Sequence, residues 1–437
     1  MTTRSFTDLG IVEPITRVLT ENNYTHPTPI QMSALPPLIE GKDMLGIAQT
    51  GTGKTAAFAL PILQKLFQTQ GNPVPKSARA LVLAPTRELA IQISDNCQIY
   101  GKHLSLRQCV IFGGVSQNPQ VHYMSRGVDI LIATPGRLLD LIQQGHVNLG
   151  RVSFLVLDEA DRMLDMGFIR DIKKIIATIP KQRQTMLFSA TMPPAISALA
   201  HSVLVHPVRV EITPQVVTVE RIEQSLYSVR RNEKGALLVT LLQDPAMEKV
   251  IVFSKTKHGA NRILAQLESA GIKSAVIHGN KSQGARQNAL EAFKNSDVRV
   301  LVATDIVARG IDVDNITHVI NYDLPDEPES YVHRIGRTAR AGAAGIAMAF
   351  CDETEGKLLH DIEKLIKRSL ARSPTPALMK LQPLAPVKNE RNRSHGGGGN
   401  NQHRGGSGKP GGGGGGGGRN RNSNSRNPHA GRGRKGS

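Results

Sequence analysis

The sequence predicts two α/β domains in tandem, each built on a parallel, doubly wound sheet, followed by a disordered basic tail. From about residue 43, short apolar runs alternate with amphipathic stretches, and this series breaks near residues 206–218 before it resumes. Nearly continuous apolar runs are typical of strands buried on both faces, and β–α alternation gives parallel sheets. Residues 388–437 hold 18 of the 42 glycines and a single apolar residue, Ala430. Such a segment cannot offset its ordering entropy by burying apolar surface.

The apolar runs predict six strands in the first domain and five in the second. In the first domain they are Met44–Ala48, Ala80–Ala84, Cys109–Phe112, Ile130–Ala133, Phe154–Leu157 and Met186–Phe188. In the second domain they are Val250–Phe253, Ala275–Ile277, Val298–Ala303, Thr317–Ile320 and Ile346–Phe350. The intervening segments, such as Thr55–Phe67 and Ala260–Ala270, predict helices.

The predicted domain bounds follow from these breaks in pattern. We expect a first domain over residues 1–207, a linker over 208–218 with no helical periodicity, and a second domain over 219–370. Residues 371–437 are expected to form the tail, which holds four prolines within residues 371–387 and then becomes rich in glycine and arginine. Ligand sites in parallel sheets are expected at the carboxyl ends of the strands.

Charge and composition exclude several classes of protein. The net charge is +18, of which residues 388–437 carry +10 and the remaining chain +8, so a polyanionic partner is favoured. No apolar run approaches the roughly 20 residues that span a bilayer, and the first residues lack the apolar core of a secretory signal. Cys97, Cys109 and Cys351 form no Cys-x-x-Cys pair, which argues against a disulfide framework or a zinc site. We therefore expect a cytoplasmic protein without a membrane partner.

The segment Ala48–Thr55 reads AQTGTGKT, and it follows a predicted strand and opens a predicted helix. Backbone N–H groups at such a glycine-rich turn bind phosphate oxygens, Lys54 adds a positive charge, and the Thr55 hydroxyl is placed to bind Mg²⁺. The alternative is a glycine turn that matches by chance. The candidate phosphate-binding residues are Thr50, Gly51, Thr52, Gly53, Lys54 and Thr55.

Two acidic residues, Asp158 and Glu159, follow the apolar run Phe154–Leu157. An acid at the end of a buried strand is well placed to hold Mg²⁺, and the adjacent glutamate to orient the attacking water. Paired acids after a strand are also typical of a helix cap. Beside the Lys54 loop on the same predicted sheet, however, they indicate a nucleoside triphosphatase.

With Asp158-Glu-Ala-Asp161 in place, the chain resembles the DEAD-box RNA helicases of superfamily 2 over roughly residues 6–350. The resemblance implies tandem RecA-like domains and an enzyme that couples ATP hydrolysis to work on RNA. Tyr24-Thr-His-Pro-Thr-Pro-Ile-Gln31 resembles the family's Q motif, with Phe6 as its preceding aromatic residue. This implies that Gln31 binds the adenine edge, since a planar amide both donates and accepts, and that ATP is preferred. It also implies that Phe6 stacks on the adenine and that Tyr24 belongs to the ATP site.

Further segments resemble the family's RNA-contacting and coupling motifs. In the first domain the implied RNA contacts are Pro85, Thr86, Arg87, Gly114, Thr134 and Arg137, and in the second they are Ser254, Arg286, Thr304 and Asp305. Such residues contact the sugar-phosphate backbone and carry no sequence information. The resemblance also implies that Ser189, Thr191 and His333 couple hydrolysis to strand separation.

The second domain supplies the other half of the implied ATP site. Gly310 and Asp312 match the segment that contacts the ribose, and His333–Arg340 resembles motif VI, whose Arg337 and Arg340 reach the γ-phosphate. Ala339 stands where the family usually has glycine. The resulting hypothesis is that two domains close on ATP and single-stranded or short duplex RNA, with Lys54, Asp158, Glu159 and both arginines as catalytic residues.

Alternatives remain open at this point. A DNA-directed translocase of the same superfamily is one, and an ATP-gated RNA clamp or annealing chaperone is another. The tail either raises the local RNA concentration or merely keeps the chain soluble. The resemblance is strongest to the bacterial RhlE-type branch, which suggests ribosomal precursors or RNA-degradation complexes as partners.

Overall fold

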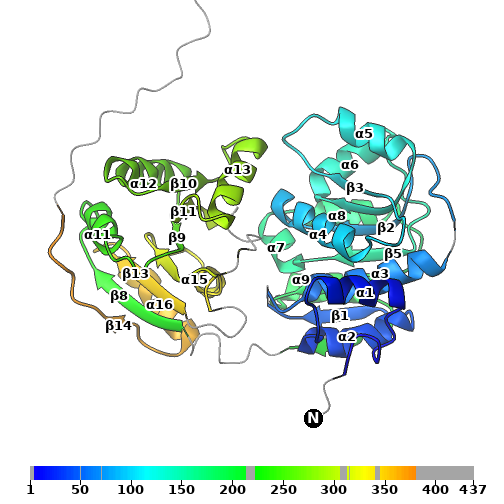
Figure 1. Ribbon diagram of the computed structural model, residues 1–437, viewed down its shortest axis with the longest axis horizontal. Coiled ribbons are helices and arrows are strands. Elements are labelled where there is room, and N and C mark those ends of the chain that lie inside the picture. Colours follow the sequence, from blue (N-terminus) through cyan, green and yellow to red (C-terminus); the bar gives the residue numbers. More distant parts are fainter. Residues whose placement is uncertain are drawn as a thin grey trace, which may run out of the picture. The chain divides into compact units, whose positions relative to one another are not determined.

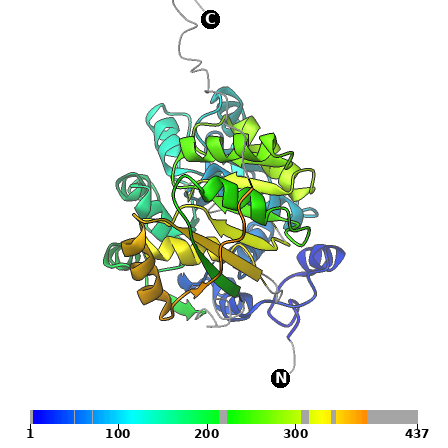
Figure 2. The ribbon, with the colours of Figure 1, turned by 90° about the vertical axis from the view of Figure 1, so that its left-hand side faces the viewer.

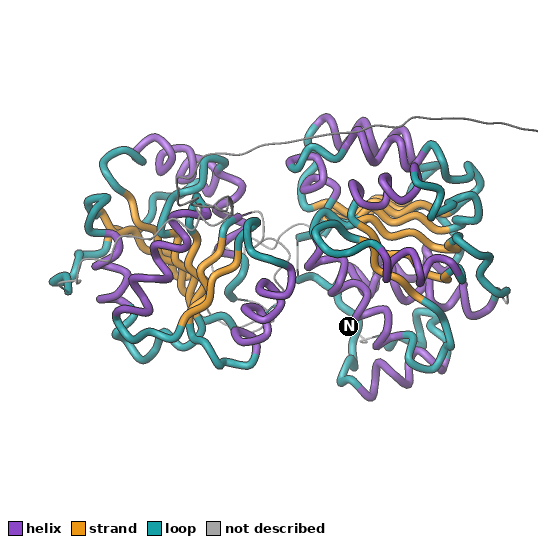
Figure 3. Tube along the Cα trace, turned by 90° about the horizontal axis from the view of Figure 1, so that it is seen from above, coloured by secondary structure: helices purple, strands orange, loops and turns teal. Residues whose placement is uncertain are grey.

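A computed structural model describes residues 4–49, 51–69, 71–212, 222–305, 313, 315–339 and 345–379. Residues Met1–Leu384 form one compact unit, which holds two seven-stranded sheets (Figure 1). In each sheet every recorded strand pair is parallel, and helices lie on both faces of the strands (Figure 3). The predicted class of two parallel α/β domains is therefore confirmed. Within the described ranges no helix is long and apolar enough to cross a membrane.

The first sheet has the strand order β3-β4-β2-β5-β6-β1-β7. Its strands are β1 (Met44–Ile47), β2 (Ala78–Leu83), β3 (Gln108–Ile111), β4 (Val128–Ala133), β5 (Phe154–Leu157), β6 (Gln184–Ser189) and β7 (Val208–Glu211). Alternate residues of strands β1 to β6 enter two separate apolar cores, one on each face, as in Leu155 and Val156 of β5. This two-sided burial explains why the strands are almost continuously apolar.

Two sets of helices cover the first sheet. The helices packed in the core of Phe58 and Phe188 are α1 (Glu13–Glu21), α2 (Pro29–Ile39), α3 (Lys54–Gln68) and α4 (Arg87–Tyr100). The helices packed in the core of Leu155 are α5 (Asn118–Ser125), α6 (Pro135–Gln143), α7 (Ala160–Asp165), α8 (Ile169–Ile176) and α9 (Pro194–Val203).

The second sheet, drawn from green to orange and facing the viewer in Figure 2, has the order β10-β11-β9-β12-β13-β8-β14. Its strands are β8 (Ile222–Ser228), β9 (Val250–Phe253), β10 (Ser274–Ile277), β11 (Val300–Ala303), β12 (His318–Asn321), β13 (Gly345–Cys351) and β14 (Ala371–Arg372). Helices α11 (Lys234–Leu241) and α12 (Lys257–Ser269) pack on one face. Helices α13 (Gln283–Lys294), α15 (Pro328–Ile335) and α16 (Gly356–Ile366) pack on the other.

Three strands were not predicted, and each differs from the continuous apolar pattern. Strand β8 alternates buried residues with more exposed ones. Gln224 in this strand is polar and buried, and its side chain accepts a hydrogen bond from the Tyr331 hydroxyl at 3.0 Å. Strand β7 lies inside the stretch expected to be linker, where Val210 packs in the first core. Strand β14 lies in the expected tail, and residues up to 379 continue along the second domain, where the Met379 amide donates to Thr240 at 3.0 Å.

We predict that Gly127→Ala destabilises the first domain by about 3 kcal/mol. Gly127 has a φ of 71°, and a β-carbon there would collide with the backbone carbonyl of Val74. The left-handed conformation costs an alanine about 1 kcal/mol, and relieving the collision adds about 2 kcal/mol. Urea unfolding of the full chain measures the difference.

Gly145→Ala is the matched control. Gly145 has a φ of 72°, but a β-carbon there meets no atom within 4 Å. It should therefore cost only the conformational part, about 1 kcal/mol. Equal losses in the two variants would show that the Val74 contact plays no part.

Candidate functional site

The phosphate loop joins β1 to α3 and depends on glycine at two positions. Gly51 and Gly53 have φ values of 83° and 93°, which glycine adopts at no steric cost. A β-carbon on Gly53 would collide with the side-chain amide of Gln31. Lys54, only 6% exposed, donates from Nζ to the Ala48 carbonyl at 2.9 Å and so lies across the loop. Thr55 follows in the first turn of α3, and Thr50 lies outside the described residues.

Gln31 is bonded to the phosphate loop itself. Its side chain donates to the Gly53 carbonyl at 3.1 Å and accepts from the Thr28 amide at 2.9 Å. Phe6, expected beside the adenine, is 4% exposed and belongs to the first core, whereas Tyr24 is 42% exposed and packs edge-on against Tyr100. Gln31 therefore holds the phosphate loop through its hydrogen bond to Gly53. The resemblance did not predict this contact.

The acidic pair lies at the end of β5. Asp158 is 2% exposed, and burial raises its pKa to about 6 although the neighbouring Lys54 ammonium opposes the shift. Glu159 has a φ of 53°, an uncommon conformation for a residue with a side chain, and its amide donates to the Asp158 carboxylate at 3.0 Å. This strained turn directs Glu159 into the cavity described below.

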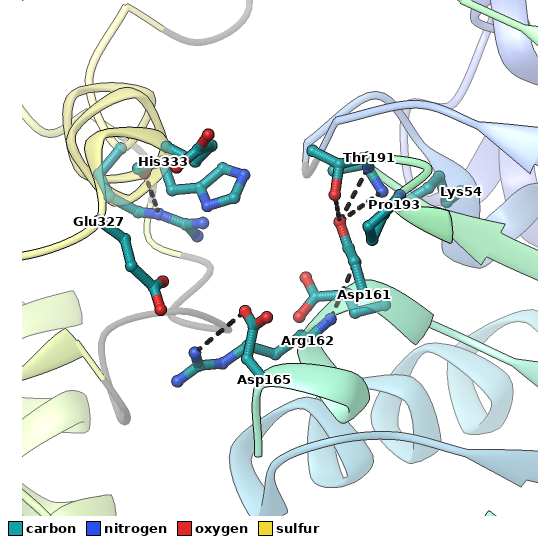
Figure 4. A pocket seen from close by; sticks show the side chains of 12 residues that line it. Lys54, Asp161, Arg162, Asp165, Thr191, Pro193, Glu327 and His333 are labelled. Carbon is teal, nitrogen blue, oxygen red and sulfur yellow. Dashed lines mark hydrogen bonds and ion pairs between the residues drawn. The ribbon is translucent and has the colours of Figure 1, made fainter. Parts of the chain in front are cut away.

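The second aspartate of the acidic segment, Asp161, was not among the predicted site residues. One of its carboxylate oxygens accepts from the Ala190 amide, the Thr191 amide and the Thr191 hydroxyl at 3.1, 2.8 and 2.9 Å (Figure 4). The Ser189 hydroxyl accepts from the Asp161 amide and donates to the Thr191 carbonyl. Strands β5 and β6 are neighbours, so the segment predicted to couple hydrolysis is joined directly to the acidic segment.

A cavity of about 340 Å³ brings residues of both domains together. Its lining from the first domain includes Lys54, Glu159, Asp161 and Thr191, and its lining from the second includes Glu327, Glu329, His333 and Arg337 (Figure 4). Arg337 is 3% exposed and donates from Nε to the His333 carbonyl at 3.3 Å. The predicted residues Gly310, Asp312 and Arg340 lie outside the described part of the chain.

Ala339 adopts a φ of 55° in the turn that follows α15. Glycine occupies this region freely, whereas alanine pays about 1 kcal/mol. Its methyl group packs against the core that contains Tyr331, and Gly345 opposite has no β-carbon to collide with the Ala339 amide. A β-carbon on Gly345 would also collide with the Thr338 side chain, so glycine at 345 leaves room for the backbone of this turn.

Several residues expected to contact RNA have polar partners within the protein in this structure. Arg286 is 7% exposed and pairs with Glu88 of the first domain at 2.7 Å. Gln283 donates to the same carboxylate at 3.1 Å, so these two residues of α13 bind a glutamate of α4. Asp305 accepts two hydrogen bonds, of 2.6 and 2.7 Å, from the guanidinium of Arg334, which is 1% exposed. Glu88 and Arg334 were not predicted as site residues.

Ser254 is fully buried, and its hydroxyl donates to Asp323 at 3.0 Å. The RNA contact that the resemblance implied for Ser254 stays a prediction, and in this structure its hydroxyl is bonded within the protein. Thr304, at the end of β11, is 8% exposed and Pro85 is buried.

The remaining predicted RNA residues of the first domain lie on loops and helix starts. Thr86 and Thr134 precede the first residues of α4 and α6, and the Thr86 hydroxyl accepts from the Leu89 amide at 3.2 Å. Gly114 lies so close to the Arg87 guanidinium that a β-carbon would collide with it. Arg137 donates to the Val115 carbonyl at 3.3 Å, which ties α6 to the same loop.

A glycine-rich phosphate loop, an acidic strand end and an arginine of the second domain, all at one cavity, define a two-domain nucleoside triphosphatase. Sequence comparison supports the same class. A model of the DEAD/DEAH box helicase family matches residues 28–199, and the helicase conserved C-terminal domain matches residues 233–342. The chain belongs to the DEAD-box family of ATP-dependent RNA helicases, which are ATP-hydrolysing enzymes.

Individual relatives agree over most of their length. The ATP-dependent RNA helicase RhlB of Shewanella amazonensis is 41% identical over 411 residues, 90% of this chain and 93% of that protein. The DEAD-box ATP-dependent RNA helicase CshA of Bacillus cereus is 41% identical over 374 residues, 86% of this chain and 70% of that protein. The expected resemblance to the RhlE-type branch has no support in these relatives.

Solved structures show the same tandem RecA-like fold. S. cerevisiae Dbp5 bound to RNA and ADP BeF3 matches with a TM-score of 0.74 at 32% identity, covering 85% of this chain and 96% of that one. Mss116p bound to ssRNA and AMP-PNP matches with a TM-score of 0.77 at 27% identity, covering 86% and 80%. The predicted fold class is confirmed.

We predict that Asp158→Asn stabilises the nucleotide-free protein at pH 8 and that this advantage shrinks as the pH falls towards 5. Burial raises the pKa of Asp158 to about 6, so above pH 6 the folded protein carries a buried carboxylate that the unfolded chain would solvate. Below pH 6 the folded protein binds this proton and progressively recovers stability, and the recovery is complete only below the ordinary pKa of 3.8. The amide does not titrate, and urea unfolding at both pH values in EDTA measures the difference.

Asp140→Asn serves as the control, because Asp140 is half-exposed and its ion pair with Arg137 is long, at 3.6 Å. Its effect on the free energy of unfolding should vary much less between pH 8 and pH 5. If the gain in free energy of unfolding from Asp158→Asn were the same at pH 8 and pH 5, the raised pKa of Asp158 would be contradicted.

Proposed function

We propose that the chain hydrolyses ATP when RNA is bound and uses this cycle to separate short RNA duplexes or remodel RNA–protein complexes. The observation that carries the proposal is the cavity, because it is lined by Lys54 and Glu159 of one domain and by Arg337 of the other. An ATP site that draws on both domains makes hydrolysis depend on their arrangement. RNA that binds both domains would then control turnover.

Each residue at the cavity has a distinct proposed task. Lys54 and the loop amides bind the β- and γ-phosphates, and Glu159 orients the attacking water. Arg337, with Arg340, neutralises charge that develops on the γ-phosphate, a contribution of ~10³–10⁵ in rate in related systems. Mg²⁺ would bind the Thr55 hydroxyl and Asp158, since oxygen ligands suit this ion, and it would neutralise phosphate charge when bound.

RNA is proposed to bind along the carboxyl ends of the strands through its sugar-phosphate backbone. In the first domain the Arg87–Gly114 pair, Thr134 and Arg137 lie on neighbouring loops there, and in the second Thr304 and the loop after β9 do so. Dbp5 and Mss116p were each solved with RNA bound, which supports RNA as the ligand. Ribosomal precursors or RNA-degradation complexes are the proposed cellular substrates, with the cytoplasm as the place of action.

We also propose that the first domain covers residues 1–207 extended by β7, because this strand pairs with β1. The linker would then follow residue 212, and the second domain would include β14 and residues to 379. The remaining tail lies outside the described residues.

Glu159→Gln should abolish turnover and leave ATP binding intact. The amide keeps the size of the side chain but cannot serve as a carboxylate toward water, whereas the phosphate contacts of the loop are unchanged. We expect the RNA-stimulated rate of phosphate release to fall at least 100-fold, with the ATP dissociation constant within two-fold of wild type. Fluorescent-nucleotide titration and phosphate release measure the two quantities.

Asp165→Asn is the matched control, because Asp165 also lines the cavity but is 40% exposed at the end of α7. It should retain most of the rate. Hydrolysis by Glu159→Gln at the wild-type rate would remove Glu159 from its proposed task. Displacement of a short RNA duplex by wild type, but not by Glu159→Gln, would distinguish a helicase from an ATP-gated clamp, and DNA in place of RNA tests the translocase alternative.

Deleting residues 388–437 should weaken RNA binding and flatten its salt dependence. These residues carry a net charge of +10, and each phosphate neutralised adds to the slope of log affinity against log salt. The maximal ATPase rate at saturating RNA should remain unchanged, because the cavity residues are intact. Fluorescence anisotropy from 50 to 300 mM KCl gives the slope, and an unchanged RNA affinity would favour a merely solubilising tail.

A further inference from the structure

A buried lysine, Lys234, lies among three carboxylates at the carboxyl edge of the second sheet. Its side chain is 2% exposed, and Nζ lies 2.6 Å from Glu355, 3.1 Å from Asp352 and 3.8 Å from Asp323. The Tyr322 ring lies 5.9 Å from the ammonium. Neither the sequence motifs nor the proposed mechanism assigns these residues a task.

The three carboxylates have different roles. Glu355 also accepts from the amides of Leu324 and Asp352, and Asp352 accepts from Thr354, so both hold the chain locally. Asp323, the most distant of the three, is the one that reaches outward, with a side chain 26% exposed. Lys234 therefore keeps its two nearest partners without Asp323.

Asp323 holds the loop that leads from β9 into α12. Its Oδ2 accepts from the Ser254 hydroxyl at 3.0 Å and from the Lys255 amide at 2.9 Å. Its Oδ1 faces the Lys234 ammonium, and this contact orients the carboxylate so that Oδ2 points to the loop. The next residues, Thr256 and Lys257, are exposed where α12 begins.

The backbone of Asp323 makes a second connection. Its carbonyl accepts from Arg334 Nη1 at 2.7 Å, and the same guanidinium pairs with Asp305. Arg334 belongs to α15, the helix that carries His333 and leads to Arg337. One residue thus links the loop after β9 with the arginine helix that borders the cavity.

We propose that Asp323, oriented by Lys234, is a positioning residue that holds the Ser254–Thr256 loop in place for the RNA backbone. The inference rests on the proposed RNA-binding function and adds a residue that does not itself contact RNA. Burial of Ser254 agrees with it, because a fully buried hydroxyl bonded to Asp323 fixes the loop from within. The exposed amides and side chains that follow are then available to phosphate.

The test compares Asp323→Asn with Asp326→Asn. Both remove one negative charge from the same loop, and Asp326 is 65% exposed and pairs with the Lys255 side chain at 2.5 Å. Electrostatics alone predicts that losing an acid near a polyanion leaves RNA affinity unchanged or tightens it, in both variants. A positioning role for Asp323 predicts weaker RNA binding, and only in Asp323→Asn.

We expect Asp323→Asn to weaken binding of a single-stranded RNA about ten-fold in the presence of a non-hydrolysable ATP analogue, measured by anisotropy. The RNA concentration for half-maximal ATPase should rise equally, with kcat at saturating RNA and ATP affinity within two-fold of wild type. Asp326→Asn should bind RNA at least as tightly as wild type. Asp323→Asn that binds as tightly as Asp326→Asn would overturn the inference.

Ser254→Ala provides a second reading, since it removes the hydroxyl bond and leaves the Lys255 amide and Lys234 in place. About a three-fold loss of RNA affinity is expected, and no loss would count against the inference even where Asp323→Asn fails to fold. A wild-type chain that binds no RNA would overturn the proposed function and this inference together. If wild type and Asp323→Asn bind RNA with equal affinity, this inference is overturned and the proposed function stands.

Discussion

Parallel pairing of the strands is the constraint on which the site depends, because it sends the carboxyl ends of every strand in a sheet to one edge. Strands β5, β6 and β1 are neighbours in the first sheet, so Asp158, Ser189 and the phosphate loop meet although more than 100 residues separate the loop from either. In the second sheet β11, β9, β12 and β13 are neighbours and carry Asp305, Ser254, Asp323 and Asp352 at the same edge. Each loop can vary in sequence while the strand beneath keeps its end in position.

The cost of buried charge determines how these edges are stabilised. Lys54, Lys234, Arg286 and Arg334 are all at most 7% exposed, and each lies against a carboxylate or a carbonyl. An unpaired buried charge costs several kcal/mol, whereas an intact pair contributes little net stability. Such pairs therefore favour one arrangement over others more than they stabilise the fold. This asymmetry means that each of these four cations is held where its polar partner lies.

The pattern of apolar residues and the spacing of motifs predicted most of the fold and the part of the candidate site that the first domain contributes. The runs around β1 to β6 are apolar on both faces, so their pattern alone identified them, whereas β8 alternates and β14 is two residues long. Lys54 and Glu159 follow strands in the sequence, and their meeting at one edge could be inferred. The pairing of Arg286 with Glu88 could not, because 198 residues separate them and the same residue types serve equally well in RNA contacts. Sequence gives the chemistry of a side chain but not whether its partner is the protein or the ligand.

Two residues near the cavity carry backbone strain of the same kind. Glu159 and Ala339 have φ values of 53° and 55°, each costing about 1 kcal/mol relative to glycine. Strain of this kind persists only where the surroundings determine the conformation. The Asp158 carboxylate binds the Glu159 amide, and glycine at 345 leaves room for the backbone of the turn at Thr338 and Ala339. One strained turn holds the proposed water-orienting carboxylate and the other follows Arg337, so either can relax at small cost if ligand binding rearranges its support. The strain thus lowers the free-energy difference between this arrangement of Glu159 and Arg337 and one in which either turn has relaxed.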